Sequence, residues 1–586
     1  MSKLLSRRDL NFLLYDVLDS EALTRTQLYG MHDRAAFEGV VEAAFTLAEA
    51  VFAPFAAKLD ANEPTFDGER VHTIPELHAA IDAFVEGGFT AMAFPEAHGG
   101  MQLPFTVATA ANLAFSAANG PAQGYAFLTN GAAHLLLAHG SPEQIETYAR
   151  PMIEGRWFGT MALSEPQAGS SLAEVATKAE PHADGSWRLT GGKMWISGAE
   201  HELRENIVNL VLARLPDAPA GVKGISLFIV SKWLPDGTRN GVRLVGLNRK
   251  MGNRGTTNTV LSFGAEEPCV GYLVGEPHKG LTYMFHMMNE ARIGVGASAA
   301  VTAYRGWMEA SAYAKERRQG RPLGAKDPNA PPVAIAEHPD VKRMLLAQKA
   351  IAEGSLCLCL YCARLVDQLA VEEDAETRAD LHTLLELLTP VAKSWPSEKG
   401  CEANALAIQV HGGYGYTEDF PVERLYRDQR LNPIHEGTTG VQGLDLLGRK
   451  LTMDGGRGVR VFGARVAETV AAAADGPFAR EAAALDAALK RLTGIGMRLL
   501  GQAASDPARG LGNATLFLGA FGTLVVGWLW LEQVATLRDA PHDSFRVGKE
   551  AACRYLFAYE LPLAEAAMTT LEGGADLLAN TPAEAL

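Results

Sequence analysis

The pattern of apolar and polar positions divides the chain into stretches of different character. Ala- and Leu-rich helical periodicity runs over residues 37–157, in segments such as FEGVVEAAFTLAEAVFAPFAAKL. Over residues 158–277, short β-branched and aromatic runs such as NIVNLVLARL and GISLFIV alternate with Gly, Asp and Pro, which predicts strands. Helical periodicity returns over residues 278–452 and, after the Gly-rich break MDGGRG, over residues 459–586. The predicted fold is mostly α with an inserted β domain: an N-terminal extension at 1–36, a helical domain, a β domain, a helical bundle and an appended helical domain.

One apolar stretch needs a separate interpretation. No residue from Leu511 to Leu531 is charged, and the stretch is long enough to span a bilayer. Small residues recur every four positions at Gly519, Thr523 and Gly527, a spacing that lets helices approach closely. The stretch lies late in the chain and has no flanking Lys/Arg cluster, which favours a helix buried in a bundle or an interface. No stable membrane insertion is therefore expected.

Composition and charge exclude several classes of function. The formal net charge is −15 and residues 459–586 carry three more acidic than basic residues, so binding to nucleic acid is not expected. The spacing of Cys357, Cys359 and Cys362 fits neither a zinc site nor a disulfide framework, and no metal site is predicted. The N-terminus lacks a long apolar run with a cleavage site, and the chain ends in AEAL. A cytoplasmic location is therefore expected.

Candidate chemistry gathers in LNPIHEGTTGVQGLDLLGRK at 431–450. The backbone N–H groups and hydroxyls of EGTTG, close to a helix start, suit a phosphate group. Glu436 lies in an otherwise apolar stretch, where desolvation raises a carboxyl pKa and lets the group remove a weakly acidic proton near neutral pH. A Glu at this place can also simply stabilise the helix dipole, and the residues alone do not separate these interpretations.

Two further clusters are weak signals when each is taken alone. QVHGGYGYTEDFPVERLYRD at 409–428 has glycines that allow close backbone approach to a ligand, but it does not fit the dinucleotide fingerprint. MALSEPQAGSS at 161–171 is followed by KMWIS. These segments place Ser164, Ser170 and Trp195 where they can line one face of an aromatic cofactor.

Taken in order, these motifs and several others resemble the acyl-CoA dehydrogenase family over most of residues 70–450. The other segments that carry the resemblance are FPEAHGG, AAHLLLAHGSPEQIETYARPMIEGRWFGT, LTGGKMWISG, KMGNRGTTNTVLSF, NEARIGVG and AYAKERRQGR. The opening RRDLNFLLYDVLDSEAL and the appended helical stretch resemble the subgroup of 3-methylmercaptopropionyl-CoA dehydrogenases and related bacterial fatty acyl-CoA dehydrogenases. The resemblance implies an α-helical N-terminal domain, a β-barrel-like middle domain, a helical bundle and the extra C-terminal helical domain of this subgroup.

The resemblance also implies a reaction and a set of residues. The reaction is FAD-dependent dehydrogenation of an acyl-CoA thioester to a trans-2-enoyl-CoA, as in β-oxidation, with electrons passed to an electron-transfer flavoprotein. Glu436 would be the catalytic base. The residues implied for FAD are Leu163, Ser164, Trp195, Ile196, Ser197, Arg317, Gln409, Gly412, Gly413 and Thr438. Those implied for acyl-CoA are Ser170, Asn289, Arg292 and Gly437. Several of the FAD residues would grip the cofactor of a neighbouring subunit, so a homodimer is expected.

Some relatives supply the base from the position immediately before the arginine that binds CoA. That position is Ala291 here, and Glu290 lies one residue earlier, about 100° around a helix. Glu436 is therefore the predicted base. Three alternatives are an acyl-CoA oxidase that uses oxygen, a DNA-associated flavoprotein of the alkylation-response type, and a non-catalytic acyl-CoA-binding relative. The acidic balance of 459–586 disfavours the second, and Glu436 in IHEGT disfavours the third.

Overall fold

A computed structural model describes residues 3–327 and 329–586, and the side chains of residues 285–289 lie outside that description. The chain forms two compact units. The β-containing unit is Met31–Ala291, and the helical unit combines Met1–Gly30 with Arg292–Leu586. Each unit holds some of the residues that the sequence predicts for the site.

The β-containing unit begins with helices that pack around one long, kinked helix. The helices are α2 (Arg34–Leu47), α3 (Ala56–Ala61), α4 (Pro75–Glu86), α5 (Phe105–His139), α6 (Pro142–Gln144) and α7 (Arg150–Ile153). The backbone of Asn119 leaves the helical region, and Pro121, which cannot donate a helical hydrogen bond, follows two residues later. Asn119 Nδ2 donates to the carbonyl of Phe52 at 3.3 Å, so the kink is tied to the preceding helical segment.

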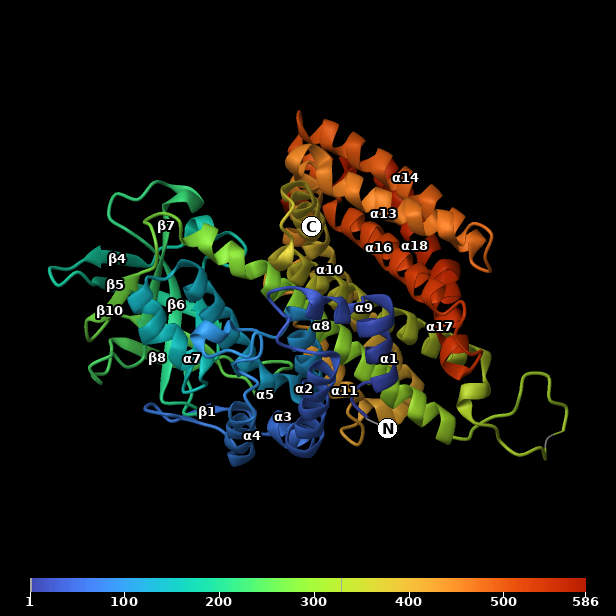
Figure 1. Cartoon of the computed structure of the whole chain (residues 1–586), viewed down its shortest axis with the longest axis horizontal. Coiled ribbons are helices and arrows are strands. Elements are labelled where there is room, and N and C mark those ends of the chain that lie inside the picture. The colour runs from blue at the N-terminus through green and yellow to red at the C-terminus, as the bar shows by residue number, and fades with distance from the viewer. Residues whose placement is uncertain (1–2, 328) are drawn as a thin grey trace. The chain divides into compact units, whose positions relative to one another are not determined.

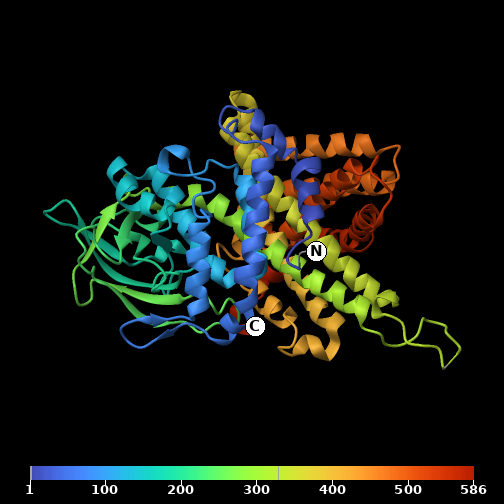
Figure 2. The same cartoon turned by 60° about the horizontal axis from the view of Figure 1, so that its bottom comes forward.

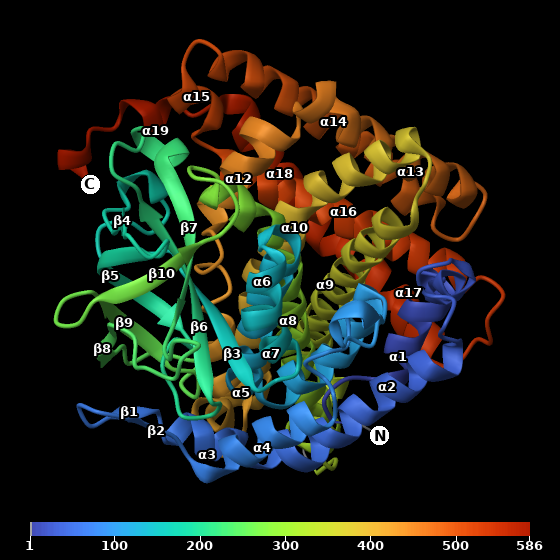
Figure 3. The same ribbon diagram turned by 60° about the vertical axis from the view of Figure 1, so that its left-hand side comes forward.

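The β-containing unit continues with a small closed barrel. Its strands are β3 (Trp157–Ala162), β4 (Lys178–Pro181), β5 (Trp187–Ser197), β6 (Asn206–Arg214), β7 (Ile225–Ser231), β8 (Val242–Leu247), β9 (Asn258–Phe263) and β10 (Cys269–Leu273). The order is β10-β7-β6-β4-β5-β9-β8, and a further pairing of β10 with β5 closes five strands into a ring. Figure 3 shows these strands side by side. A barrel-like middle domain is therefore confirmed.

The helical unit is built on long helices that pack side by side. They are α8 (Gly280–Glu316, of which Arg292 onward belongs to this unit), α9 (Pro339–Val371) and α10 (Ala375–His411). The shorter α11 (Val422–Gln429) and α12 (Thr439–Asp445) follow. The segment between α8 and α9 projects away from these helices as a long loop (Figures 1 and 2). The turn between α11 and α12 contains Glu436.

The appended helices form a layer around one apolar helix. They are α13 (Arg457–Ala473), α14 (Ala479–Ala503), α15 (Pro507–Leu511), α16 (Ala514–Thr536), α17 (Ser544–Tyr555), α18 (Leu561–Gly573) and α19 (Asp576–Asn580). Helix α16 lies against α9, α10, α12, α14 and α18, and the crossing helices are visible in Figure 1. Two hydrogen bonds join α16 to its neighbours: Trp530 Nε1 donates to the carbonyl of Ala350 on α9 at 3.1 Å, and Trp395 Nε1 on α10 donates to Thr523 Oγ1 of α16 at 3.2 Å.

Among the residues that the structure describes, three helical segments are long and apolar enough to cross a membrane. They are Arg34–Ala61, Pro339–Val371 and Pro507–Thr536. In the last of these, which contains α16, 83% of the most apolar window is buried inside the protein. The packing of α16 accounts for its apolar sequence as the interior of a helical layer.

A buried ion cluster fastens the N-terminal helix α1 (Arg7–Asn11) to the helical unit. Asp9 forms an ion pair with Lys549 Nζ on α17 at 2.5 Å, and it accepts a hydrogen bond from the Tyr304 hydroxyl on α8 at 3.0 Å. Lys549 also pairs with Glu353 on α9 at 2.9 Å, and Lys349 pairs with the same carboxylate. Asp9, Glu353 and Lys549 are all buried, so their charges compensate one another rather than being solvated.

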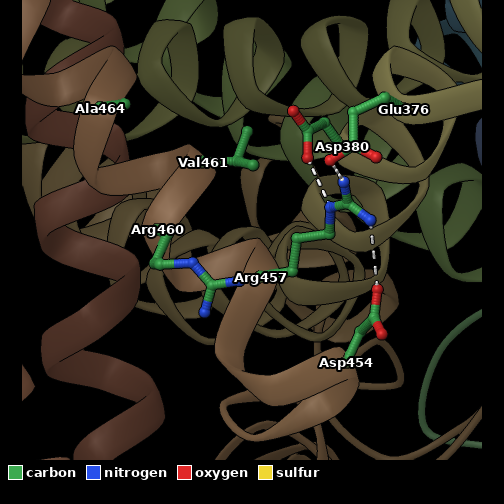
Figure 4. Close-up of a pocket in the computed structure, with 7 residues that line it drawn as sticks. All are labelled: Glu376, Asp380, Asp454, Arg457, Arg460, Val461 and Ala464. Atoms are coloured by element: carbon green, nitrogen blue, oxygen red, sulfur yellow. Dashed lines mark hydrogen bonds and ion pairs between the residues drawn. The ribbon is translucent and has the colours of Figure 1, made fainter. Parts of the chain in front are cut away.

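A second ion cluster fixes the start of the appended helices. Arg457, the first residue of α13, pairs with Asp380 at 2.6 Å, with Asp454 at 3.5 Å and with Glu376. Figure 4 shows the guanidinium pointing among these three carboxylates beside a shallow hollow that Arg460, Val461 and Ala464 also line. The Gly-rich break of the sequence is therefore a turn whose following helix is tied back onto α10.

Candidate active site

Glu436 lies in a strained turn just before α12. The backbone φ is +52° at Glu436 and +85° at Gly437. Two consecutive residues therefore adopt the left-handed backbone conformation, which residues other than Gly rarely adopt. Gly437 fits because a Cβ there would come within 2.6 Å of Gln442 Nε2. Thr438 caps α12, and its Oγ1 accepts a hydrogen bond from the Val441 N–H at 3.4 Å.

Side chains from two other helical segments hold the carbonyls of this turn. Gln442 Nε2 on α12 donates to the carbonyl of Glu436 at 3.0 Å. Lys393 Nζ on α10 donates to the carbonyl of Gly437 at 2.7 Å. Both side chains are fully buried. Buried side-chain donors thus hold the unusual backbone of the turn, and this backbone fixes the orientation of the Glu436 side chain.

Burial and two cations set the protonation of Glu436. Burial raises the pKa of the carboxyl above its usual 4.5, while the charges of Arg292 and Lys393 act in the opposite direction. Burial is the larger effect, so the pKa is raised overall. A half-buried carboxyl with a raised pKa is suited to remove a proton from carbon near neutral pH.

Burial also shifts the pKa values of the ionisable residues near Glu436. Arg292 is buried and pairs with Asp445 at 3.1 Å, and burial lowers its pKa. Burial also lowers the pKa of Lys393 to about 8, although the negative charges of Glu436 and Glu398 act to raise it. His435 is held neutral, because burial first and the charge of Lys393 second lower its pKa to about 3.

A group of predicted FAD residues lies together at one end of the helical unit. Arg317 follows the last residue of α8, and Gln409 lies in the last turn of α10; both are exposed. Stacking of Tyr313 on His411, with ring centroids 4.4 Å apart, brings these two helix ends together. Gly412 and Gly413 follow directly, and a Cβ on either would meet no atom within 4 Å. The structure therefore places Arg317, Gln409 and the two glycines around open space.

A second group of predicted FAD residues lies in the β-containing unit. Leu163 and Ser164 directly follow β3, and the Ser164 carbonyl accepts a hydrogen bond from the Met194 N–H at 3.0 Å. The register of β5 shifts between Met194 and Ile196, and Trp195 in between has φ +65°. This bulge turns the Trp195 indole outward, where 58% of it is exposed.

The remaining predicted residues fall in varied settings. The side chain of Ile196 is buried in the barrel, so only its backbone is available to a ligand, whereas Ser197 is half-buried and accepts a hydrogen bond from Asn258. Ser170 is exposed in the loop after β3. The side chain of Asn289 lies outside the described residues.

Sequence reasoning missed a buried ion pair beneath the Leu163 loop. Lys193 Nζ on β5 donates to the Leu163 carbonyl and to Glu165 Oε1, both at 2.9 Å. Glu165 also accepts hydrogen bonds from the N–H groups of Ala176 and Thr177 and from the Thr177 hydroxyl. The one available signal is a Lys on the buried face of a strand in WRLTGGKMWIS, a position where a charge requires a partner.

Lys393, in PVAKSWP of α10, is a second residue that sequence reasoning missed. It lies 43 positions before Glu436 in the chain, so no local pattern connects the two. A Lys among apolar residues of a long helix is the only hint that the sequence offers.

Comparisons with known proteins identify the family. The four family models that match are the acyl-CoA dehydrogenase N-terminal domain at 37–156, the middle domain at 160–265, the C-terminal domain at 278–451 and the acetyl-CoA dehydrogenase C-terminal like domain at 462–582. The 3-methylmercaptopropionyl-CoA dehydrogenase of Ruegeria pomeroyi is 39% identical over 491 residues, 82% of each chain. The broad-specificity linear acyl-CoA dehydrogenase FadE5 of Mycobacterium tuberculosis is 35% identical over 96% of both chains.

A solved structure gives the same result for the fold. Caenorhabditis elegans ACDH-11, solved in complex with C11-CoA, superposes with a TM-score of 0.75 at 21% identity, and the match covers 94% of this chain and 91% of that one. The predicted fold and the predicted family are both confirmed. The chain belongs to the acyl-CoA dehydrogenase family and is an FAD-dependent oxidoreductase with the extra C-terminal helical domain.

Proposed function

We propose that this acyl-CoA dehydrogenase converts a linear acyl-CoA to its trans-2-enoyl-CoA with Glu436 as the base that removes the α-proton. The observation that supports this role is the turn itself: a half-buried carboxylate of raised pKa, with two cations nearby, on a backbone held by Gln442 and Lys393. A carboxylate of this kind is neither too weak to accept a carbon-bound proton nor permanently protonated.

The substrate must be polarised before its α-proton becomes acidic. We propose that the backbone N–H of Glu436 donates to the thioester carbonyl, where negative charge develops as the proton leaves. Removal of one such fixed donor typically costs about 3–4 kcal/mol of transition-state stabilisation. Arg292 and Ser170 are proposed to contact the CoA moiety, and Gly437 gives the acyl group close access to the backbone.

The residues present fit FAD. The exposed indole of Trp195, on a bulge beside Ser197, offers a flat surface for an aromatic ring system, and Leu163 and Ser164 offer adjacent backbone. The open space at Gly412 and Gly413, next to the exposed Arg317, suits a diphosphate. When bound, FAD accepts the hydride that leaves the β-carbon. The chain's own contribution is to bind, orient and take the proton.

The electron acceptor and the assembly are also proposals. Two electrons must leave the cofactor after each turnover, and we propose an electron-transfer flavoprotein as the acceptor. We propose a homodimer, because Arg317 and Gln409 are exposed beside the exposed rings of Tyr414 and Tyr416, a mixed surface suited to a second subunit. A cytoplasmic location without membrane insertion completes the proposal.

The decisive experiment is anaerobic mixing of the FAD-loaded protein with a panel of acyl-CoA thioesters of increasing chain length, including a thioether acid. The flavin absorbance should bleach rapidly with at least one thioester. Glu436→Gln should slow bleaching by roughly 10²–10⁴-fold, the usual contribution of a positioned base. Glu290→Gln is the matched control and should bleach at the parent rate.

Three outcomes would contradict the proposal or redirect it. A Glu436→Gln variant that bleaches normally would exclude Glu436 as the base. Failure of every thioester would exclude the substrate class. Fast reoxidation by oxygen, without need of an electron-transfer flavoprotein, would assign an oxidase instead.

A further inference from the structure

Lys393 is a buried cation whose only described contact in the site is a neutral carbonyl. Its side chain is fully buried on α10, and Nζ donates to the Gly437 carbonyl at 2.7 Å. Burying a lysine costs free energy unless its charge or its hydrogen bonds are used. A buried Lys at this place therefore needs a reason in the structure around it.

The groups that face Glu436 come from several elements. Arg292 lies on α8 and Lys393 on α10, and both charges act on the Glu436 carboxylate. Asp445 on α12 pairs with Arg292 at 3.1 Å and with Arg449 at 2.9 Å. Glu398, on α10, acts on Lys393 through its charge and accepts a hydrogen bond from the Thr439 hydroxyl at 2.5 Å. His435, next to the base, stays neutral.

These contacts compensate the charges of Arg292 and Lys393 to different extents. The charge of Arg292 is compensated at contact distance by the carboxylate of Asp445. The ammonium of Lys393 is bonded instead to the Gly437 carbonyl, which compensates it only as a dipole. Arg292 has the larger effect on the Glu436 carboxylate, but Lys393 has no described carboxylate at contact distance that offsets its charge.

The same hydrogen bond also holds the backbone of the base. Gly437 has φ +85° and Glu436 has φ +52°, so the turn depends on outside contacts to persist. Gln442 donates to the Glu436 carbonyl at 3.0 Å and to the Gly437 carbonyl at 3.5 Å, and Lys393 is the closer donor to the Gly437 carbonyl, at 2.7 Å. Loss of Lys393 would leave the Gly437 carbonyl with only the 3.5 Å hydrogen bond from Gln442, which would let the carboxylate move.

We infer that Lys393 is a positioning residue for the catalytic base, fixing the carbonyl of Gly437 and keeping the Glu436 carboxylate ionised by its charge. The inference rests on the proposed function, in which Glu436 takes the α-proton. It gives Lys393 two separable actions, a hydrogen bond that orients and a charge that tunes.

Two substitutions separate these actions. Lys393→Met removes both the donor and the charge, and Lys393→Gln removes the charge but keeps a donor. Lys399→Met is the matched control, because Lys399 lies six residues further along α10 and pairs with Glu402 and Glu560 rather than with the base turn. All are compared as FAD-loaded full-length proteins, with flavin content and thermal stability measured alongside.

The readout is the pH profile of flavin bleaching by a thioester that reduces the parent protein. In the parent, the rate falls at low pH as Glu436 becomes protonated. Without the Lys393 charge this acidic limb should move to higher pH by about one unit, the lower end of the effect of a nearby opposite charge. Lys393→Gln and Lys393→Met should both show the shift, and Lys399→Met should not.

The possible results separate this inference from the proposed function. A shifted acidic limb in Lys393→Gln, with flavin content unchanged, supports the positioning role even if Lys393→Met does not fold. An unshifted limb in Lys393→Gln overturns it. If Glu436→Gln, run in the same series, keeps the parent rate, the proposed base is wrong and the inference falls with it. If Glu436→Gln is inactive while the limb stays in place, only the role of Lys393 is refuted.

Discussion

In each of its two units the chain has a buried lysine beneath a loop for which a role in the site is proposed, and the two lysines differ in their partners. Lys193 of the β-containing unit donates to the Leu163 carbonyl and also pairs with Glu165 at 2.9 Å. Lys393 of the helical unit donates to the Gly437 carbonyl and has Glu436 nearby rather than at contact distance. Burial lowers the pKa of both lysines to about 8.

The two carboxylates near these lysines have pKa values shifted in opposite directions. Burial by itself raises the pKa of Glu165, but Lys193 and the donors from Thr177 and Ala176 outweigh it and hold the pKa at about 2. The Glu165 carboxylate already accepts hydrogen bonds from all of these donors, so it cannot accept a proton from a substrate. Glu436 has no such set of donors, so burial dominates and its pKa rises. The pKa of Glu436 stays raised, as its proposed role as a base requires, because no described cation contacts its carboxylate.

The largest expected effect tests the structural lysine. Lys193→Met should destabilise the protein by about 3–5 kcal/mol, because the Glu165 carboxylate stays buried without its cation. The measurement is urea denaturation of the FAD-loaded protein, followed by flavin fluorescence and circular dichroism. Adding Glu165→Gln to Lys193→Met should recover part of the loss, since the amide is neutral and its oxygen still accepts a hydrogen bond. A double variant less stable than the single one would show that the charge pair is not the source of the effect.

Lys393→Met should cost less stability than Lys193→Met, about 1–3 kcal/mol. It leaves the Gly437 carbonyl with only the 3.5 Å hydrogen bond from Gln442 but leaves no carboxylate that had been paired at contact distance. The same denaturation experiment measures it. Equal losses for the two lysines would remove the distinction between them.

Gly437→Ala tests whether the base turn depends on its left-handed backbone. A Cβ at this position meets Gln442 Nε2 at 2.6 Å, and φ +85° is unfavourable for Ala, so a loss of about 1–2 kcal/mol is expected. Bleaching by acyl-CoA should slow as well, because the displaced Gln442 no longer holds the Glu436 carbonyl. Gly440→Ala is the control in the same segment, since only Thr438 Oγ1 lies near the added Cβ, at 3.8 Å. Unchanged stability and rate in Gly437→Ala would mean that the turn tolerates another geometry.

The smallest expected effect is a gain in stability from Glu436→Gln. Because the folded-state pKa of Glu436 is raised above 4.5, this group favours the folded state below pH 4.5, and that contribution is lost as pH rises through the raised pKa. Glu436→Gln should therefore be more stable than the parent at neutral pH, by roughly 0.5–2 kcal/mol, with the difference closing toward pH 4.5. Thermal melts across this range measure it. A difference independent of pH would show that Glu436 is not a buried, strained charge.

The family and the order of its parts could be predicted from the sequence because their signals are local. Helical and strand periodicity predict the α, β, α order. The motifs that carry the family resemblance, such as FPEAHGG, MALSEPQAGSS and IHEGTTG, are each contiguous in the chain. The strands could be predicted from β-branched and aromatic runs separated by Gly, Asp and Pro, whereas their closure into a barrel was implied only by the resemblance to the family. Glu436 was expected as the base because the contiguous motif IHEGTTG carries the family resemblance, whereas the residues alone also allowed a role in stabilising the helix dipole.

Only the tertiary structure decided which residues support these motifs, because the contacts join positions far apart in the chain. Asp9 meets Lys549, Lys193 meets the Leu163 carbonyl, and Lys393 meets the Gly437 carbonyl. The positive φ of Glu436 and of Trp195 is likewise imposed by surroundings rather than by residue type, since neither prefers that region. Periodicity fixes which face of an element is buried, but the partner that a buried charge finds depends on how the elements pack. The sequence by itself thus determined the fold class and the family, and the packing decided the burial and the neighbouring charges that set the pKa of Glu436.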